Sequence, residues 1–127
     1  GARYLCNVGC FATAIDDPFT PISGVVNTQA RFDKVAVVAL SVSGETEQTI
    51  AMTKSLKERG CTVISITNSA SCTLARMSDH NLNYYMTDVR LNGYFQLTCQ
   101  APVICLLEMI GRRLYQPGPH DTFTEVK

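Results

Sequence analysis

The sequence predicts a doubly wound α/β domain, in which helices cover both faces of a mainly parallel sheet to give three α/β/α layers. Two nearly continuous apolar runs, at 34–42 (KVAVVALSV) and 61–68 (CTVISITN), have the composition of parallel strands that are buried on both faces. A helical pattern follows each run, at 44–59 and at 72–78. The 127 residues are enough for one domain with its own core.

The segments before the first apolar run are less regular. Residues 2–8 have a helix-forming composition, and Gly9 is expected to end that helix. Residues 10–16 indicate a short strand that ends at the aspartates and proline that follow. Because residues 18–33 contain two prolines and a glycine, we expect a loop there, with a short helix near 22–31.

Signals in the rest of the chain continue the α/β alternation. The helix at 44–59 carries acids in its first turn and bases in its last turn, which suits the helix dipole, and Gly60 is expected to end it. Pro102 is compatible with a helix if it lies in the first turn. The remaining elements are expected in this order: a short helix at 72–78, a strand near the sheet edge at 80–86, a polar connection at 87–96, and a long apolar helix at 96–115.

Composition argues against several classes of function. Eleven basic and eleven acidic residues give a formal net charge of zero, which disfavours a nucleic-acid-binding surface within this chain. No apolar run approaches the ~20 residues of a membrane span, and the first ten residues lack the core of a signal peptide. The six cysteines show neither CxxC nor zinc-ligand spacing. We therefore expect a cytoplasmic protein with reduced thiols and with no metal, cofactor or membrane partner.

The turn between the first apolar run and its helix carries the clearest chemical signal. Ligands of open parallel sheets bind beyond the carboxyl ends of the strands. There Ser41, Ser43 and Thr46 supply hydroxyl groups, and Gly44 lets the backbone bend sharply and approach a ligand closely. A helix that starts near residue 44 would add unpaired N–H groups, which favour an anion. The pattern predicts a small cup for one phosphate.

What this turn lacks narrows the ligand. It contains no lysine, so it is not a P-loop, and the sequence contains no GxGxxG for a dinucleotide. An uncharged cup suits a phosphate monoester of a small molecule. A simpler alternative remains open, in which Ser43 only caps the helix. Glu45 and Glu47 are most simply read as acids that complement the dipole of the first helical turn.

These residues resemble a known family. The stretch SVSGETEQT at 41–49 resembles the phosphosugar-binding signature of the SIS (sugar isomerase) domain. Residues 56–82 resemble the helix–strand–helix continuation of that family, with an ITNS strand end and an LA-x-x-SD helix. Residues 96–114 are most similar to the SIS domain of RpiR/MurR-type bacterial transcription regulators. The resemblance implies a SIS-like, flavodoxin-like fold.

The resemblance also implies a set of binding residues. The phosphate would be held by the hydroxyls of Ser41, Ser43 and Thr46, with help from the backbone N–H groups of Val42, Gly44 and Glu45. Further sugar contacts are expected from residues that follow the later strands, with polar turns and a solvated loop as the alternatives: Asn68, Ser69, Asp88 and Arg90. The family match assigns no catalytic residue and no metal ligand here.

One departure from the family pattern concerns the first strand. The chain starts within what should be the first helix, so we expect an N-terminally incomplete domain at 1–115 and a tail at 116–127. The missing strand would lie between those at 10–16 and 34–42. Losing it would leave two unpaired sheet edges, so we expect either a partner chain along them or a rearranged sheet.

The resemblance leaves rival functions open. The first is a non-catalytic effector domain that senses a sugar phosphate, forms a homodimer or higher oligomer through the helix at 101–114, and acts on DNA only through a separate domain absent here. The alternative is a phosphosugar aldose–ketose isomerase, which needs a base, and often a histidine for ring opening. Neither His80 nor His120 has a recognisable catalytic partner in the sequence. A third reading is a structural dimerisation module.

Overall fold

A computed structural model describes residues 1–15 and 34–119 of the chain. Two compact units divide it: residues 1–14 with 101–127, and residues 15–100, each taken in its described part. The elements are α1 (Ala2–Asn7), β1 (Ala36–Ser41), α2 (Glu47–Glu58), β2 (Thr62–Thr67), α3 (Thr73–Met77), β3 (His80–Asn83), β4 (Arg90–Leu91), β5 (Phe95–Gln96) and α4 (Ala101–Leu114).

Three parallel strands form the sheet, in the order β1-β2-β3. The register places Ser41 of β1 opposite Thr67 of β2, and Thr67 opposite Asn83 of β3. All three strands therefore end at one edge. The parallel sheet with helices against it confirms the predicted α/β class, and β3 is an edge strand as expected. Among the described residues, β1 pairs on one side only.

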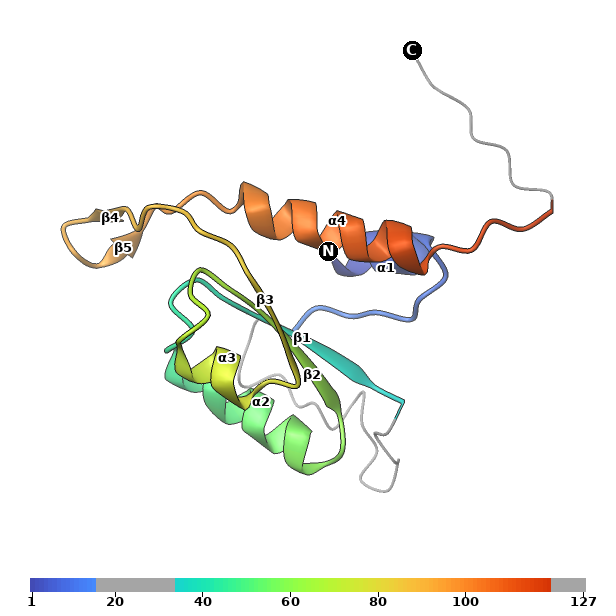
Figure 1. Cartoon of the computed structure of the whole chain (residues 1–127), viewed down its shortest axis with the longest axis horizontal. Coiled ribbons are helices and arrows are strands. Elements are labelled where there is room, and N and C mark those ends of the chain that lie inside the picture. The colour runs from blue at the N-terminus through green and yellow to red at the C-terminus, as the bar shows by residue number, and fades with distance from the viewer. Residues whose placement is uncertain (16–33, 120–127) are drawn as a thin grey trace, which may run out of the picture. The chain divides into compact units, whose positions relative to one another are not determined.

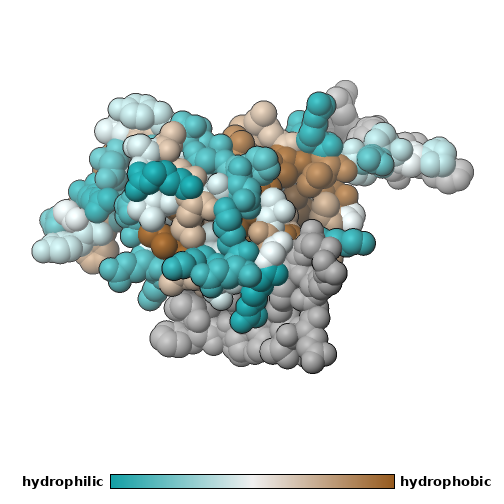
Figure 2. All heavy atoms as spheres, turned by 60° about the horizontal axis from the view of Figure 1, so that its bottom comes forward, coloured by the Kyte–Doolittle hydropathy of each residue, from teal (hydrophilic) through white to brown (hydrophobic). Residues whose placement is uncertain are grey.

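Helices α2 and α3 cover one face of this sheet (Figure 1). Leu56 of α2 and the buried Cys61 pack with Val37 of β1. A second cluster joins Ala39 of β1 to Leu74 and neighbouring residues of α3. Seen from the side of these helices, their outer surface is mostly hydrophilic (Figure 2). The two clusters fix α2 and α3 against β1, whose carboxyl end carries the predicted cup.

Beside these clusters, the interior of the sheet holds a polar network. Ser65 and Thr67 of β2 are both 0% exposed. The side-chain amide of Asn81 on β3 donates to Ser65 Oγ at 2.9 Å and to Thr67 Oγ1 at 3.0 Å. Thr67 Oγ1 donates onward to the carbonyl of Ser69 at 2.7 Å. Since buried hydroxyls need partners, this network fixes the β2–β3 pairing and the loop that follows β2.

Near the amino ends of β2 and β3, Asp79 ties three elements together. Its carboxylate accepts from the Val63 N–H at 2.8 Å and pairs with Lys57 Nζ of α2 at 2.8 Å. Lys57 Nζ also donates to the carbonyl of Met77 at 2.6 Å. The hydrogen bond from Lys57 and then the one from Val63 hold the pKa of Asp79 below its usual value. Asp79 therefore links the end of α2, the start of β2 and the entry into β3.

The predicted strand at 10–16 is wrong over its described part. Residues 10–15 form no strand, and Phe11 is 95% exposed. A strand requires a hydrogen-bonded neighbour, and no described segment pairs with this one. The helix expected near 22–31 and the turn at residues 16–18 lie outside the described residues.

The connection expected at 87–96 contains a small hairpin instead. Strands β4 and β5 pair antiparallel around Asn92 and Gly93, which have φ values of 53° and 74°. Two consecutive positive φ angles are typical of a tight hairpin turn, for which Asn-Gly is the strongest short sequence signal. Figure 1 shows this hairpin projecting beyond the sheet. The Leu-Asn-Gly-Tyr sequence held the information that the prediction of a plain loop overlooked.

The other unit pairs α1 with α4. Gly111 of α4 faces Tyr4, and a Cβ at Gly111 would lie 2.4 Å from Tyr4 Cε1, so the ring rests directly on the helix. Pro102 is the second residue of α4 and thus lies in its first turn, as expected. Every helix in the described part of the chain is too short or too polar to cross a membrane.

Replacing Asn81 tests the buried network. Asn81→Ala leaves two buried hydroxyls without their donor and should lower the free energy of unfolding by about 1–3 kcal/mol. Asn83→Ala, at an exposed position of the same strand, should stay within about 0.5 kcal/mol. Urea unfolding followed by circular dichroism compares the two variants, and equal effects would contradict a structural role for the network.

The Asp79 contacts predict a pH dependence. The folded-state pKa lies below the unfolded value, so Asp79 stabilises the fold above that value and loses its effect as the pH falls through the lowered pKa. Asp79→Asn should therefore be less stable than wild type near neutral pH, and the difference should shrink below about pH 4. Unfolding at a series of pH values measures it. A difference that does not change with pH would contradict this role.

Candidate functional site

The predicted cup residues lie in the loop that joins β1 to α2. Helix α2 begins at Glu47, with Thr46 as its N-cap residue, rather than near residue 44 as predicted. Ser43 does not cap α2, because its Oγ accepts from the Glu45 N–H at 3.2 Å within the loop. The loop can therefore shape a site that is separate from the first helical turn.

Three hydroxyl groups gather in this loop. Ser41 Oγ lies 3.2 Å from Thr46 Oγ1 and accepts from the Gly44 N–H at 3.0 Å. Ser43 and Thr46 are exposed, and Ser41 is half-buried. The amides of Gly44 and Glu45 donate to the loop's own serines. The hydroxyl protons of the exposed residues are therefore the donors that can reach an incoming phosphate.

Gly44 is required at its position for two reasons. Its φ of 68° is a conformation that L side chains rarely adopt. A Cβ at Gly44 would also lie 2.1 Å from Cys72 Sγ and 3.4 Å from Thr67 Cγ2. The loop therefore sits directly on the segment that follows β2, a closeness that only the missing side chain allows.

This second segment, residues 69–73, brings further hydroxyls to the same edge of the sheet. Ser69 Oγ lies 3.1 Å from Ser71 Oγ and accepts from the Ser71 N–H at 3.2 Å. Ser71 is exposed and was not among the predicted residues. The hydroxyl-rich stretch NSASCT after β2 was the sequence signal that could have found it. We refer to residues 42–46 as the cup loop and to residues 69–73 as the second loop.

The side chain of Glu45 joins the two loops. One carboxylate oxygen accepts from the Thr73 N–H at 2.7 Å, and this hydrogen bond is the main cause that lowers the pKa of Glu45. Glu45 precedes α2, so its predicted role as a first-turn acid of that helix is wrong. Glu47 does lie in that first turn.

The candidate sugar contacts have structural partners. The Asn68 side chain donates to the Met86 carbonyl at 2.7 Å and accepts from the Met86 N–H at 2.6 Å, so its amide holds the chain after β3. Asp88 and Arg90 form an ion pair of 3.0 Å at the hairpin. Hydrogen bonds from Gln96 and then from other hairpin residues lower the pKa of Asp88. Contact between these residues and a sugar stays a prediction.

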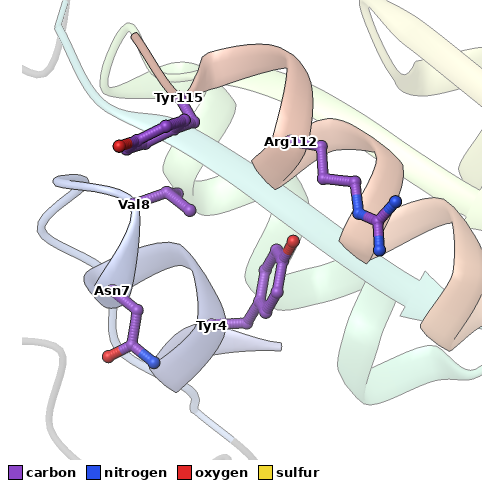
Figure 3. Close-up of a pocket in the computed structure, with 5 residues that line it drawn as sticks. All are labelled: Tyr4, Asn7, Val8, Arg112 and Tyr115. Atoms are coloured by element: carbon purple, nitrogen blue, oxygen red, sulfur yellow. The ribbon is translucent and has the colours of Figure 1, made fainter. Parts of the chain in front are cut away.

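Two hollows elsewhere are weaker candidates. One, of about 520 Å³, is lined by Tyr4, Asn7, Val8, Arg112 and Tyr115 of α1, α4 and their flanks. Figure 3 shows the Asn7 and Arg112 side chains pointing in different directions, so its polar groups do not converge. The other, of about 400 Å³, is lined by Lys54, Lys57, Glu58 and Met77. Within the described residues, no three His, Cys, Asp or Glu side chains could hold a metal.

The comparisons with known proteins agree with this geometry. Residues 29–90 match the family described as SIS domain, a segment that contains both the cup loop and the second loop. The chain therefore contains an SIS domain. No curated protein sequence matches it significantly.

Solved structures of the same fold come from several bacteria. The chain resembles c3406 of E. coli CFT073, solved with a bound phosphosugar (TM-score 0.69, 23% identity), and the sugar isomerase domain of an RpiR transcription factor from Sphaerobacter thermophilus (TM-score 0.70, 18% identity). In each case 89% of this chain aligns, and it spans 59% of the other. A candidate phosphosugar isomerase from Clostridium difficile 630 aligns with 88% of this chain and 32% of its own length (TM-score 0.63, 20% identity).

Substitution of Gly44 tests the close packing of the two loops. Gly44→Ala should destabilise the protein by about 2–4 kcal/mol, because left-handed strain and a clash with Cys72 add together. Gly60→Ala is the matched control, since Gly60 also has a positive φ of 94°, but a Cβ placed there would meet no atom within 4 Å. It should cost only the strain, about 1–2 kcal/mol. Chemical unfolding measures both, and equal costs would contradict the close contact.

Proposed function

We propose that the cup loop binds the phosphate of a sugar phosphate, and that the chain serves as the effector domain of a transcription regulator. The observation that supports this most is the gathering of Ser41, Ser43 and Thr46 in one turn at the carboxyl edge of the parallel sheet. Hydroxyl donors in such a turn are suited to a phosphate oxygen.

The hydrogen bonds in the cup loop assign different roles to its hydroxyls. Ser43 and Thr46 are exposed and can donate directly to a phosphate. Ser41 receives the Gly44 N–H and lies next to Thr46 Oγ1, so it positions Thr46 and extends the chain of hydrogen bonds. Residues 41–46 contain no lysine or arginine. Such a site suits one phosphate monoester rather than a polyphosphate.

The sensor is favoured over an isomerase by the placement of the acids and bases. The Glu45 carboxylate accepts from the Thr73 N–H and thus has a structural partner. His80 begins β3, at the edge opposite the carboxyl ends of the strands. Aldose–ketose isomerisation needs a base within reach of the sugar carbons. In the described part of the chain, neither residue is placed to act as that base at the cup.

The rest of the proposal concerns the whole protein. We propose a cytoplasmic domain at 1–115, followed by a tail, that forms homodimers and reaches DNA only through a separate domain. Helix α4 exposes Ile104, Met109 and Leu114, an apolar surface that a second copy could cover. The solved RpiR sugar isomerase domain supports the regulator assignment by fold. Ligand binding would then act by favouring one arrangement of the dimer.

An isomerase is the second candidate, since a candidate phosphosugar isomerase shares the fold. Incubating the protein with aldose and ketose 5- and 6-phosphates, followed by ¹H NMR, separates the two functions. We expect saturable binding without interconversion of the sugars. Turnover that Glu or His substitutions abolish would establish the isomerase instead.

The cup hydroxyls give a graded binding test. Ser43→Ala should weaken the binding of a sugar phosphate by about 1–3 kcal/mol, because a charge-assisted hydrogen bond is lost. Thr46→Val should have a similar effect. Ser55→Ala, on the exposed side of α2, is the control and should bind as wild type does. Calorimetric titration with sugar phosphates and their unphosphorylated sugars measures this, and unchanged binding by Ser43→Ala would contradict the cup.

A further inference from the structure

An acidic residue in the middle of a turn proposed to bind phosphate needs an explanation. A carboxylate beside a phosphate repels it, and Glu45 lies between two of the cup hydroxyls in the sequence. In the structure, this carboxylate contacts the start of α3, where Oε1 accepts from the Thr73 N–H at 2.7 Å. Its charge is therefore directed to the neighbouring helix.

The cup loop in fact supplies much of the cap of α3. Glu45 takes the N–H of Thr73, and the Gly44 carbonyl takes the N–H of Leu74 at 3.0 Å. The next amide, of Ala75, donates to Cys72 Sγ at 3.4 Å. The first turn of a helix has N–H groups without partners inside the helix, and here the cup loop satisfies two of them. The start of α3 and the cup loop are thus held as one unit.

We propose that Glu45 is a positioning residue, which clasps the cup loop to the first turn of α3 and thereby holds the Ser43 and Thr46 hydroxyls in place for a phosphate. This inference rests on the proposed function. It goes beyond it by giving a role in anion binding to an acid that never touches the anion.

The clasp and simple charge repulsion predict opposite effects. If Glu45 acted only as a nearby negative charge, its neutralisation would strengthen the binding of phosphate. If Glu45 orders the cup, neutralisation weakens binding, because the loop must then be ordered at the cost of binding energy. The matched control is Glu47, an acid in the first turn of α2. Glu47→Gln removes a negative charge from the same region without touching the clasp.

The donor side of the clasp can be removed separately. Thr73 is the first residue of α3, where proline is tolerated, so Thr73→Pro deletes the N–H while the helix can still form. Thr73→Ala keeps that N–H and removes the hydroxyl, which contributes less than the N–H to the lowered pKa of Glu45. Comparison of the two variants therefore measures what the backbone contact adds.

The clasp can be observed without any ligand. The lowered pKa means that it is intact near neutral pH and is lost as the pH falls through that value. The ¹⁵N-resolved amide of Thr73 should follow this titration in the wild-type protein and should not do so in Glu45→Gln. A Thr73 amide that does not respond to the titration of Glu45 would overturn the clasp, whatever the protein binds.

The binding experiment is calorimetric titration with inorganic phosphate and with ribose 5-phosphate near neutral pH. Glu45→Gln and Thr73→Pro should each bind both probes about tenfold more weakly than wild type. Glu47→Gln should bind as well as wild type or better, and Thr73→Ala should lose less affinity than Thr73→Pro. Equal or tighter binding by Glu45→Gln would overturn the inference and leave the proposed function standing. A wild-type protein that binds neither probe would overturn the proposed function, and this role with it.

Discussion

The close contact between Gly44 and Cys72 is the constraint on which the rest of the site depends. A Cβ at residue 44 would lie 2.1 Å from Cys72 Sγ, so only glycine lets the cup loop rest on the start of α3. That contact brings Glu45 to the Thr73 N–H and the Gly44 carbonyl to the Leu74 N–H. The arrangement of the cup hydroxyls thus follows from a missing side chain, and the second loop supports it.

The parallel core was predictable because its signals are local. The apolar run that became β1 and the run that became β2 were recognised from composition, with ends that differ from the structure by one or two residues. Helix α2 ends where Gly60, with a φ of 94°, was expected to stop it. The strand predicted at 10–16 failed because a strand depends on a partner, which the composition of one segment cannot reveal.

The site was predictable in part for a similar reason. Serine, glycine and threonine at 41–46 indicate a phosphate cup by their chemistry alone. The clasp of Glu45 could not be predicted, since it joins residues 28 positions apart and depends on how α3 packs. The pair of hydrogen bonds between Asn68 and Met86 is likewise a tertiary contact. Residues that touch a ligand leave a motif, whereas residues that position them leave one only when they are close in sequence.

The most direct test of the account is to map a bound sugar phosphate onto the backbone amides by NMR. Titration with ribose 5-phosphate should shift the amides of residues 42–46 and 69–73 together, and unphosphorylated ribose should leave them unchanged. The coupled response follows from the contacts between the two loops. Shifts confined to the hollow lined by Tyr4 and Arg112, or an identical response to both sugars, would contradict a phosphate cup at the end of β1.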